Sequence, residues 1–406
     1  MAEREKMKKI LVFSHALELG GAERALLGLL QSLDYEQYQV DLFLMRHEGE
    51  LMKYIPEEVH LLPEIPEYTC LAVPISEVLK KKKIKILYGR VKGKTKAAEY
   101  VKKHNLNADN GVALEYSHKY TCKYMPNVSV EEYDLAISFL TPHYFTAQKV
   151  NAKKKIAWIH TDYSFLDIDV TSEERMWNAF DYIASISDAC TEGFCSKFPN
   201  LRGRIVRIDH IIPADFVRKQ AETYEVTREM PRDGSIRILS VGRFCNAKNF
   251  DNVPDICRRL LDVGLNVKWY LIGFGPDEEL IKQKIRESAM EKNVIILGKK
   301  DNPYPYMKEC DWYIQPSRYE GNCVCVHEAQ ILGKPVIITN YATAASQLDD
   351  GVDGIIVPGD NEGCAKQLEK LLRDEKIKEK LINACCAIDY RENTQIQKVY
   401  GILKGK

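Results

Sequence analysis

Two carboxylates with a suggestive spacing occur in residues 317–335, whose sequence is SRYEGNCVCVHEAQILGKP. Apolar residues recur at helical spacing over 323–332, so we expect Glu328 on a helix and Glu320 in the loop before it. The first turn of a helix presents unpaired N–H groups to a phosphate, and a carboxylate accepts two hydrogen bonds from neighbouring ribose hydroxyls. The stretch therefore predicts a nucleoside-diphosphate pocket, with Glu320 holding hydroxyls beyond the phosphates. Taken singly, Glu320 would be interpreted as a solvated loop charge and Glu328 as a surface helix residue.

A pair of basic residues follows the strand expected at 236–241. Gly242 ends this strand, Arg243 comes next, and Lys248 lies five residues further on. Cations that are already in place can stabilise negative charge on a bound phosphate group without a metal. Arg can fork to two phosphate oxygens, whereas Lys acts as a point charge. Solvated basic residues at a helix start are a weaker explanation, because Lys there opposes the helix dipole.

Two further candidate ligand-binding positions follow strands expected in the first half of the chain. His160 follows an expected strand at 156–159, and parallel sheets bind ligands at the carboxyl ends of their strands. Gly20 and Gly21 occupy the turn after an expected strand at 10–14, where glycine lets a ligand approach the backbone. A lone histidine is more often structural, and a tight turn without a ligand explains the glycine pair equally well.

Two short motifs fail as binding signatures. Gly273 and Gly275 follow an expected strand at 267–272, but Glu278 occupies the third glycine position of a dinucleotide-binding fingerprint. Residues 167–169 read D-I-D, a pattern that binds manganese in some enzymes, but they do not directly follow a clear strand. We interpret this D-x-D as chance.

Strand, loop, helix and strand alternate from residue 10 to residue 45 and again from residue 236, which predicts an α/β fold with parallel sheets. A chain of 406 residues is long enough for two or three domains. A segment with two prolines and mixed charge separates the two series and is expected to be a linker. The predicted parts are a first domain at 1–212, a linker at 213–235, a second domain at 236–390 and a terminal helix at 391–406.

The amino-acid composition argues against several classes of protein. A net charge of +0 gives no electrostatic case for nucleic acid. The 12 cysteines include no C-x-x-C pair, which indicates buried thiols in a reducing compartment. No apolar run is long enough for a signal peptide or a transmembrane helix, so we expect a cytoplasmic protein.

One segment is strongly basic in this otherwise neutral chain. Residues 80–96 hold nine Lys or Arg and no acidic residue, with apolar residues interleaved. The tract is compatible with a solvated helix face, or with an anionic membrane surface, where each basic residue contributes ~1 kcal/mol. Nucleic acid is disfavoured, because aromatic residues are sparse here and no binding motif accompanies the tract.

The two glutamates also belong to a longer pattern. Glu320, seven residues and Glu328, followed by GKPV at 333–336 and DGVDGIIV at 350–357, resemble the E-x7-E signature of retaining GT-B glycosyltransferases of the family-4 type. The resemblance covers nearly the whole chain, and its most specific motifs lie in the second half. One departure is Gln347, where many members of that family carry Glu.

The resemblance assigns roles to individual residues. Arg243 and Lys248 match the G-R-x4-K clamp that holds the donor diphosphate in that family, and His160 matches a histidine that contacts the donor sugar. Glu320 would hold the donor-sugar hydroxyls and Glu328 the ribose. The implied catalytic residues are His160, Arg243, Lys248 and Glu320. The implied donor or nucleotide contacts are Gly20, Gly21, Gly242, Gly273, Gly275, Gly321, Asn322, Cys323, Val324 and Glu328.

The resemblance implies a GT-B fold, in which an acceptor domain and a donor domain, both Rossmann-like, face a cleft. It implies a retaining transfer of a hexose from a nucleotide sugar, with UDP favoured over GDP and with no cofactor or metal. No carboxylate nucleophile is evident, which favours a front-face mechanism in which the leaving phosphate helps to deprotonate the acceptor.

The expected partners follow from the same resemblance. They are a nucleotide-sugar donor and a glycan or polyprenyl-linked acceptor in bacterial polysaccharide synthesis. Among the alternatives for residues 80–96, a membrane surface ranks first on this ground, which implies peripheral association with the inner face of the membrane. Two other functions stay open: a nucleotide-sugar 2-epimerase of the same fold, and a non-catalytic GT-B partner protein.

Overall fold

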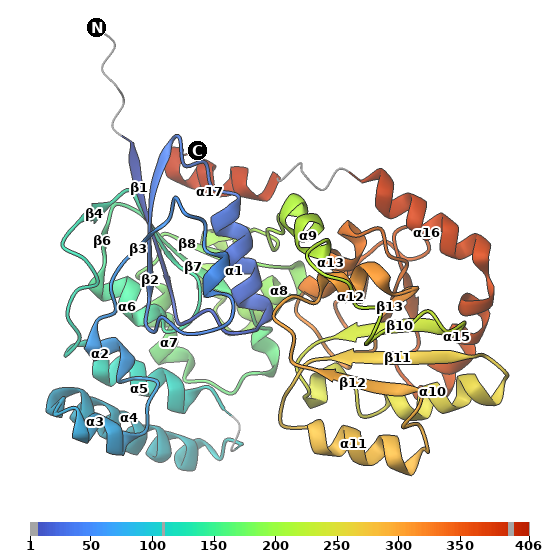
Figure 1. The fold of residues 1–406 in the computed structure, drawn as a ribbon. Coiled ribbons are helices and arrows are strands. Elements are labelled where there is room, and N and C mark those ends of the chain that lie inside the picture. Colours follow the sequence, from blue (N-terminus) through green and yellow to red (C-terminus); the bar gives the residue numbers. More distant parts are fainter. Residues whose placement is uncertain (1–6, 108–109, 389–393, 406) are drawn as a thin grey trace, which may run out of the picture. The chain divides into compact units, whose positions relative to one another are not determined.

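The computed structural model describes residues 7–107, 110–388 and 394–405, and the chain divides into two compact units (Figure 1). The first unit comprises Met1–Ile211 with Thr394–Lys406, and the second comprises Ile212–Asn393. Each unit is built around its own parallel sheet, as the alternation of strands and helices predicts.

The first unit contains a seven-stranded sheet in the order β3-β2-β1-β5-β7-β8-β9, in which every pair is parallel. Both faces of this sheet are covered: Ile10 and Val12 of β1 point into one core cluster, while Leu11 and Phe13 point into the other. This burial on two sides is why the strands read as continuous apolar runs. The strands are β1 (Lys8–Ser14), β2 (Tyr38–Leu44), β3 (His60–Leu61), β5 (Leu135–Ser138), β7 (Lys155–Ile159), β8 (Tyr182–Ser185) and β9 (Ile205–Arg207), with a separate pair β4 (Glu132–Tyr133) and β6 (Asn151–Ala152).

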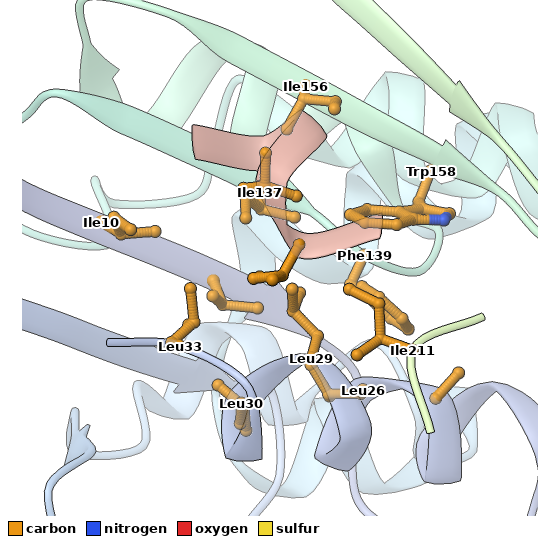
Figure 2. Close-up of a cluster of buried hydrophobic side chains, with 14 of the residues drawn as sticks. Ile10, Leu26, Leu29, Leu30, Leu33, Ile137, Phe139, Ile156, Trp158 and Ile211 are labelled. Atoms are coloured by element: carbon orange, nitrogen blue, oxygen red, sulfur yellow. The ribbon is translucent and has the colours of Figure 1, made fainter. Parts of the chain in front are cut away.

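Helix α1 (Gly21–Gln31) covers one face of this sheet with an apolar stripe. Figure 2 shows Leu26, Leu29, Leu30 and Leu33 packed towards side chains of the sheet such as Ile137. The spacing i, i+3, i+4 places Leu26, Leu29 and Leu30 on one side of the helix, and Leu33 follows just after its end. Burying each of these leucines contributes roughly 1.5–3 kcal/mol. The other helices of the unit are η1 (Met52–Tyr54), α2 (Pro66–Thr69), α3 (Ile75–Lys80), α4 (Ile84–His104), α5 (Val112–Cys122), α6 (His143–Lys149), η2 (Tyr163–Phe165), α7 (Val170–Trp177), α8 (Asp188–Lys197), η3 (Pro199–Arg204) and α17 (Thr394–Lys404).

The last helix, α17, belongs to the first unit although it follows the whole second unit in sequence. Tyr400 stacks on Tyr38 with ring centroids 4.9 Å apart, and its hydroxyl accepts a hydrogen bond of 2.8 Å from Asp34 N. The sequence predicted a terminal helix over 391–406, of which residues 391–393 and 406 lie outside the described residues.

The basic tract forms much of α4, which packs closely on α5. Gly89 and Gly93 make this approach feasible, since a Cβ on Gly93 would lie 2.6 Å from Tyr116 O. Arg90 donates hydrogen bonds to the carbonyls of Cys70 and Val73, so this arginine has a structural role and ties α4 to the preceding segment. The outer face of α4 is exposed.

The second unit contains a six-stranded parallel sheet in the order β12-β11-β10-β13-β14-β15. Ile238 and Leu239 point to opposite faces, so this sheet is also buried on both sides. The strands are β10 (Ile236–Val241), β11 (Val267–Ile272), β12 (Val294–Gly298), β13 (Trp312–Gln315), β14 (Val336–Thr339) and β15 (Ile355–Val357). The helices are α9 (Ala214–Ala221), η4 (Asn246–Lys248), α10 (Val253–Asp262), α11 (Glu278–Glu287), α12 (Tyr304–Glu309), α13 (Val324–Ile331), α14 (Ala344–Gln347), α15 (Asn361–Arg373) and α16 (Glu375–Ala387).

The structure corrects the linker expected at 213–235. Ala214, Val217 and Ala221 of α9 are buried in the core of the second unit, where α9 packs on α12 and α13. Asn302 Nδ2 also donates a hydrogen bond of 2.9 Å to Gln220 O. The prolines and charges of this segment masked a short apolar helical stripe, which is why the sequence suggested a linker.

Candidate active site

The site in the second unit is centred on an ion pair between Lys248 and Glu320. Lys248 closes η4 after β10, and Glu320 lies in the loop between β13 and α13. Lys248 Nζ donates a hydrogen bond of 2.5 Å to Glu320 Oε1, which also accepts one of 2.6 Å from Ser317 Oγ. Their side chains are only 17% and 11% exposed. The structure thus joins two residues that lie 72 positions apart in the sequence.

The surroundings keep Lys248 charged. Burial by itself lowers the pKa of Lys248, but the neighbouring Cys323 and Glu320 outweigh it, and the net result is a raised pKa. Cys323 Sγ lies 3.8 Å from Lys248 Nζ. The site therefore holds a fixed cation at the carboxyl end of the sheet, where α/β proteins bind ligands.

A second ion pair, between Arg318 and Asp251, joins the loop after β13 to the segment after β10. Arg318 donates to both carboxylate oxygens of Asp251, at 2.9 and 2.7 Å, and also to Asn246 O at 2.7 Å. Arg318 N donates to Ala247 O at 2.7 Å. The loop that carries Glu320 is thereby held against the segment that carries Lys248. The sequence offered no signal for this contact.

Three of the predicted glycines pack loops against one another. A Cβ on Gly273 would lie 1.9 Å from Gly242 O, and a Cβ on Gly275 would lie 2.3 Å from Phe244 O. A Cβ on Gly242 would lie 3.1 Å from Lys248 Cε. Gly273 and Gly275 require glycine because the loops after β10 and β11 touch there through their backbones, whereas Gly242 touches the side chain of Lys248.

The start of α13 is occupied by a side chain of the protein itself. Cys323 N donates a hydrogen bond of 2.6 Å to Gln347 Oε1, and Gln347 Nε2 lies 2.9 Å from His327 Nε2. His327 Nδ1 in turn lies 3.0 Å from Gln330 Oε1. The amide of Cys323 is thus already paired. The sequence marked Gln347 only as a departure and missed that it orders this helix start, because the contact joins α14 to α13.

Glu328 is not a surface residue, so that alternative is wrong. Its side chain is 1% exposed, and Oε1 accepts a hydrogen bond of 2.6 Å from Tyr304 OH of α12. Arg243, unlike Glu328, is exposed, and it forms no ion pair with a described residue. Gly321 and Asn322 are half-buried in the loop, and Val324 is buried at the start of α13. The ligand roles of these residues stay predictions.

The remaining predicted residues belong to the first unit. His160 Nε2 donates to Phe139 O at 2.9 Å, and His210 Nε2 lies 3.4 Å from His160 Nδ1. Burial lowers the pKa of His160 to about 3, so the ring is neutral at pH 7. Gly20 caps α1, and Gly21 begins it. A Cβ on Gly20 would lie 2.0 Å from Glu23 Oε2, so this turn is shaped by its own carboxylate.

The D-I-D sequence at 167–169 has a structural role. Asp169 caps α7 by accepting a hydrogen bond of 3.0 Å from Ser172 N, and it accepts another of 2.6 Å from Tyr116 OH. Within 7–107, 110–388 and 394–405, no group of three or more His, Cys, Asp or Glu is arranged to hold a metal ion.

Comparison with known proteins shows that the part of the chain that holds this site matches a protein family. Residues 226–385, which contain the Lys248–Glu320 pair, match the family model described as "Glycosyl transferases group 1". A Campylobacter jejuni relative, the N-acetylgalactosamine-N,N'-diacetylbacillosaminyl-diphospho-undecaprenol 4-alpha-N-acetylgalactosaminyltransferase, is 30% identical over 35% of this chain. The Staphylococcus aureus capsular polysaccharide biosynthesis glycosyltransferase CapM is 29% identical over 34%. These matches cover only 38% and 37% of the two relatives' own length.

Similarity to a solved structure extends over both units. The chain resembles Anabaena HepE in complex with UDP and glucose, with a TM-score of 0.69 and 16% identity, over 98% of this chain and 100% of that one. At this identity the likeness concerns the fold, which is an α/β fold of the GT-B type with a parallel sheet in each unit.

We expect the Lys248–Glu320 pair to be strongly coupled in stability. Lys248→Met or Glu320→Gln leaves a buried group without its partner, so each should lower the free energy of unfolding by about 2–4 kcal/mol. The double variant should cost at least about 1 kcal/mol less than the sum of the single variants. Denaturant unfolding of the four proteins measures this.

The surface pair Lys284–Glu287 on α11 is a matched control, with side chains 45% and 47% exposed. Lys284→Met should cost less than about 1 kcal/mol. Equal losses for Lys248→Met and Lys284→Met, or additive losses in the double variant, would show that the pair is not the anchor of this site.

Proposed function

Because residues 226–385 form a domain of the glycosyl transferases group 1 family within a GT-B fold, we propose that this protein is a retaining glycosyltransferase. It transfers a sugar from a UDP-sugar to a glycan or lipid-linked acceptor in polysaccharide synthesis. The observation that carries the proposal is the buried Lys248–Glu320 pair, beside which Arg243 stays exposed. The names of the relatives support the substrates: one acts on an undecaprenol-linked glycan, one belongs to capsule synthesis, and HepE binds UDP.

The cations of the site suit a departing diphosphate. Lys248 is held by Glu320 and needs no reorganisation when negative charge develops, which is the condition for strong electrostatic stabilisation. Arg243 keeps its guanidinium donors available for phosphate oxygens. The two residues supply this charge without a metal, and the nucleotide needs no other cofactor. Buried Glu328 would hold the ribose after exchanging its bond to Tyr304.

Retention follows most simply from a front-face displacement. Glu320 is already bonded to Lys248 and Ser317, which suits it to hold hydroxyls of the donor sugar rather than to attack the anomeric carbon. The bond from that carbon to the leaving phosphate breaks while the acceptor oxygen bonds on the same face, and the acceptor proton passes to the phosphate. His160 is fixed by Phe139 and His210, as a group that orients a sugar must be.

Donor consumption tests the reaction. The protein is mixed with UDP-glucose, UDP-N-acetylglucosamine or UDP-N-acetylgalactosamine and a set of octyl glycosides, and products are followed by NMR. Lys248→Ala should lower the rate at least 100-fold and Arg243→Ala at least tenfold, because each removes charge from the leaving group. Arg228→Ala is the matched control, since Arg228 is also an exposed arginine of the second unit without an ion-pair partner among the described residues.

Other outcomes separate the alternatives. Conversion of the donor sugar without any acceptor would favour the 2-epimerase. Donor binding without turnover under all conditions would favour a non-catalytic partner protein. Full turnover by Lys248→Ala would overturn the proposed mechanism.

The outer face of α4 supports a second proposal, that the first unit docks on an anionic membrane. Ile84, Tyr88 and Val91 lie at i, i+4 and i+7 and are 70%, 54% and 46% exposed. The exposed lysines Lys80, Lys82, Lys85 and Lys94 surround this apolar stripe and form no ion pair with a described residue. None of the described helices is long and apolar enough to cross a bilayer. An amphipathic basic face of this kind lies in the headgroup region of anionic lipid.

Co-sedimentation with vesicles of phosphatidylcholine and phosphatidylglycerol tests this docking. At ~1 kcal/mol per basic residue, Lys82→Glu with Lys85→Glu should lower vesicle partitioning at least tenfold. The pair Lys292→Glu and Lys366→Glu, exposed in the second unit, changes the net charge equally and should have a small effect. Partitioning that ignores phosphatidylglycerol content, or falls equally in both double variants, would refute the proposal.

A further inference from the structure

A series of buried polar side chains leads along β13 to Glu320. Tyr313 and Gln315 belong to the strand and Ser317 follows it, and the three residues are 0%, 0% and 2% exposed. Because successive residues of a strand point to opposite faces, Tyr313 and Gln315 share one face. Tyr313 packs there in an apolar core cluster, where a polar group is costly unless it is hydrogen-bonded.

Hydrogen bonds of ordinary length join these side chains in a line. Tyr313 OH donates to Gln315 Oε1 at 2.8 Å, and Gln315 Nε2 donates to Ser317 Oγ at 2.9 Å. Ser317 Oγ donates in turn to Glu320 Oε1 at 2.6 Å. Burial raises the pKa of Tyr313 well above its usual value, so the phenol keeps the proton that it donates. We call these four residues the β13 network.

The amide of Gln315 sets the direction of the bonds in the β13 network. Its oxygen accepts from the phenol of Tyr313, and its N–H group donates to the Ser317 hydroxyl, so the single proton of that hydroxyl is left for Glu320. A carboxylate in place of the amide could only accept, and Ser317 would then have two acceptors for one proton. The alignment therefore requires a side chain with a donor at one end and an acceptor at the other.

The network also decides which oxygen of Glu320 is occupied. Lys248 Nζ and Ser317 Oγ both donate to Oε1, whereas no described residue donates to Oε2. The backbone of the same loop is held as well, since Thr343 Oγ1 donates to Glu320 O at 2.8 Å and Thr339 Oγ1 donates to Ser317 O. Glu320 thus has one carboxylate oxygen bonded within the protein and the other left for a ligand.

We propose that Gln315 and Ser317 are positioning residues, which orient the Glu320 carboxylate so that its Oε2 accepts from a hydroxyl of the donor sugar. The proposal rests on the proposed glycosyltransferase function, in which Glu320 holds these hydroxyls. Lys248 acts as a point charge and does not by itself fix the plane of the carboxylate, whereas a second donor from another direction does. A misplacement of about 1 Å at a group that contacts substrate can lower the rate ~10²-fold.

Steady-state kinetics with the UDP-sugar that the native protein consumes, together with calorimetry of UDP, test this role. Ser317→Ala removes the second donor to Glu320 and should lower kcat at least tenfold. The Kd of UDP should stay within twofold, because UDP lacks the sugar that Glu320 holds. Ser240→Ala is the matched control and should keep the native kcat, since Ser240 is another 0% exposed serine of this sheet and its hydroxyl donates to Ile314 O.

Gln315→Glu tests the direction of the bonds and does not depend on how Ser317→Ala folds. The introduced carboxyl, when protonated, has one donor and one acceptor, as the amide has, but when ionised it only accepts. Its kcat divided by the native kcat should therefore fall at least tenfold from pH 5.5 to pH 8.5, as the buried carboxyl loses its proton. Dividing by the native rate at each pH removes the titrations that both proteins share.

The outcomes separate this role from the proposed function. An unchanged kcat in Ser317→Ala, a loss equal to that in Ser240→Ala, or a Gln315→Glu ratio that does not change with pH would overturn the positioning role and leave the proposed function standing. Absence of turnover by the native protein with every UDP-sugar would contradict the proposed function, and this role with it.

Discussion

The ion pair between Lys248 and Glu320 is the constraint around which the second unit is arranged. A buried charge is tolerated only when it is paired, so the loop after β10 and the loop after β13 must end at one place. Glycines at 273 and 275 let the loop after β11 approach the loop after β10, and the Arg318–Asp251 bridge joins the loop after β13 to the segment that carries Lys248. The result is a cation whose position is set before any ligand arrives.

Both units place polar groups at the carboxyl ends of parallel strands, yet they do so with opposite chemistry. The second unit offers the cations Lys248 and Arg243, which suit a diphosphate. A cavity of the first unit is lined by Glu115, Glu173 and several aromatic residues, and by no described Lys or Arg.

The sequence predicted what periodicity and motif spacing encode. The parallel α/β fold is confirmed, and the helix expected at 323–332 is observed as α13 at Val324–Ile331. Contacts between segments far apart in sequence were beyond prediction. Neither the bond of Gln347 to Cys323 nor the burial of Glu328 against Tyr304 leaves a trace in local spacing.

The central claim is that the second unit binds a uridine nucleotide through fixed protein cations. Thermal shift and calorimetry with UDP, GDP and ADP, each with and without EDTA, test it most directly. Ligand at 100 times its Kd stabilises the folded state by ~2.7 kcal/mol, which is readily measured. The account predicts a shift with UDP that exceeds those with GDP and ADP and that EDTA leaves unchanged. No shift with any nucleotide, or a UDP shift that EDTA abolishes, would contradict it.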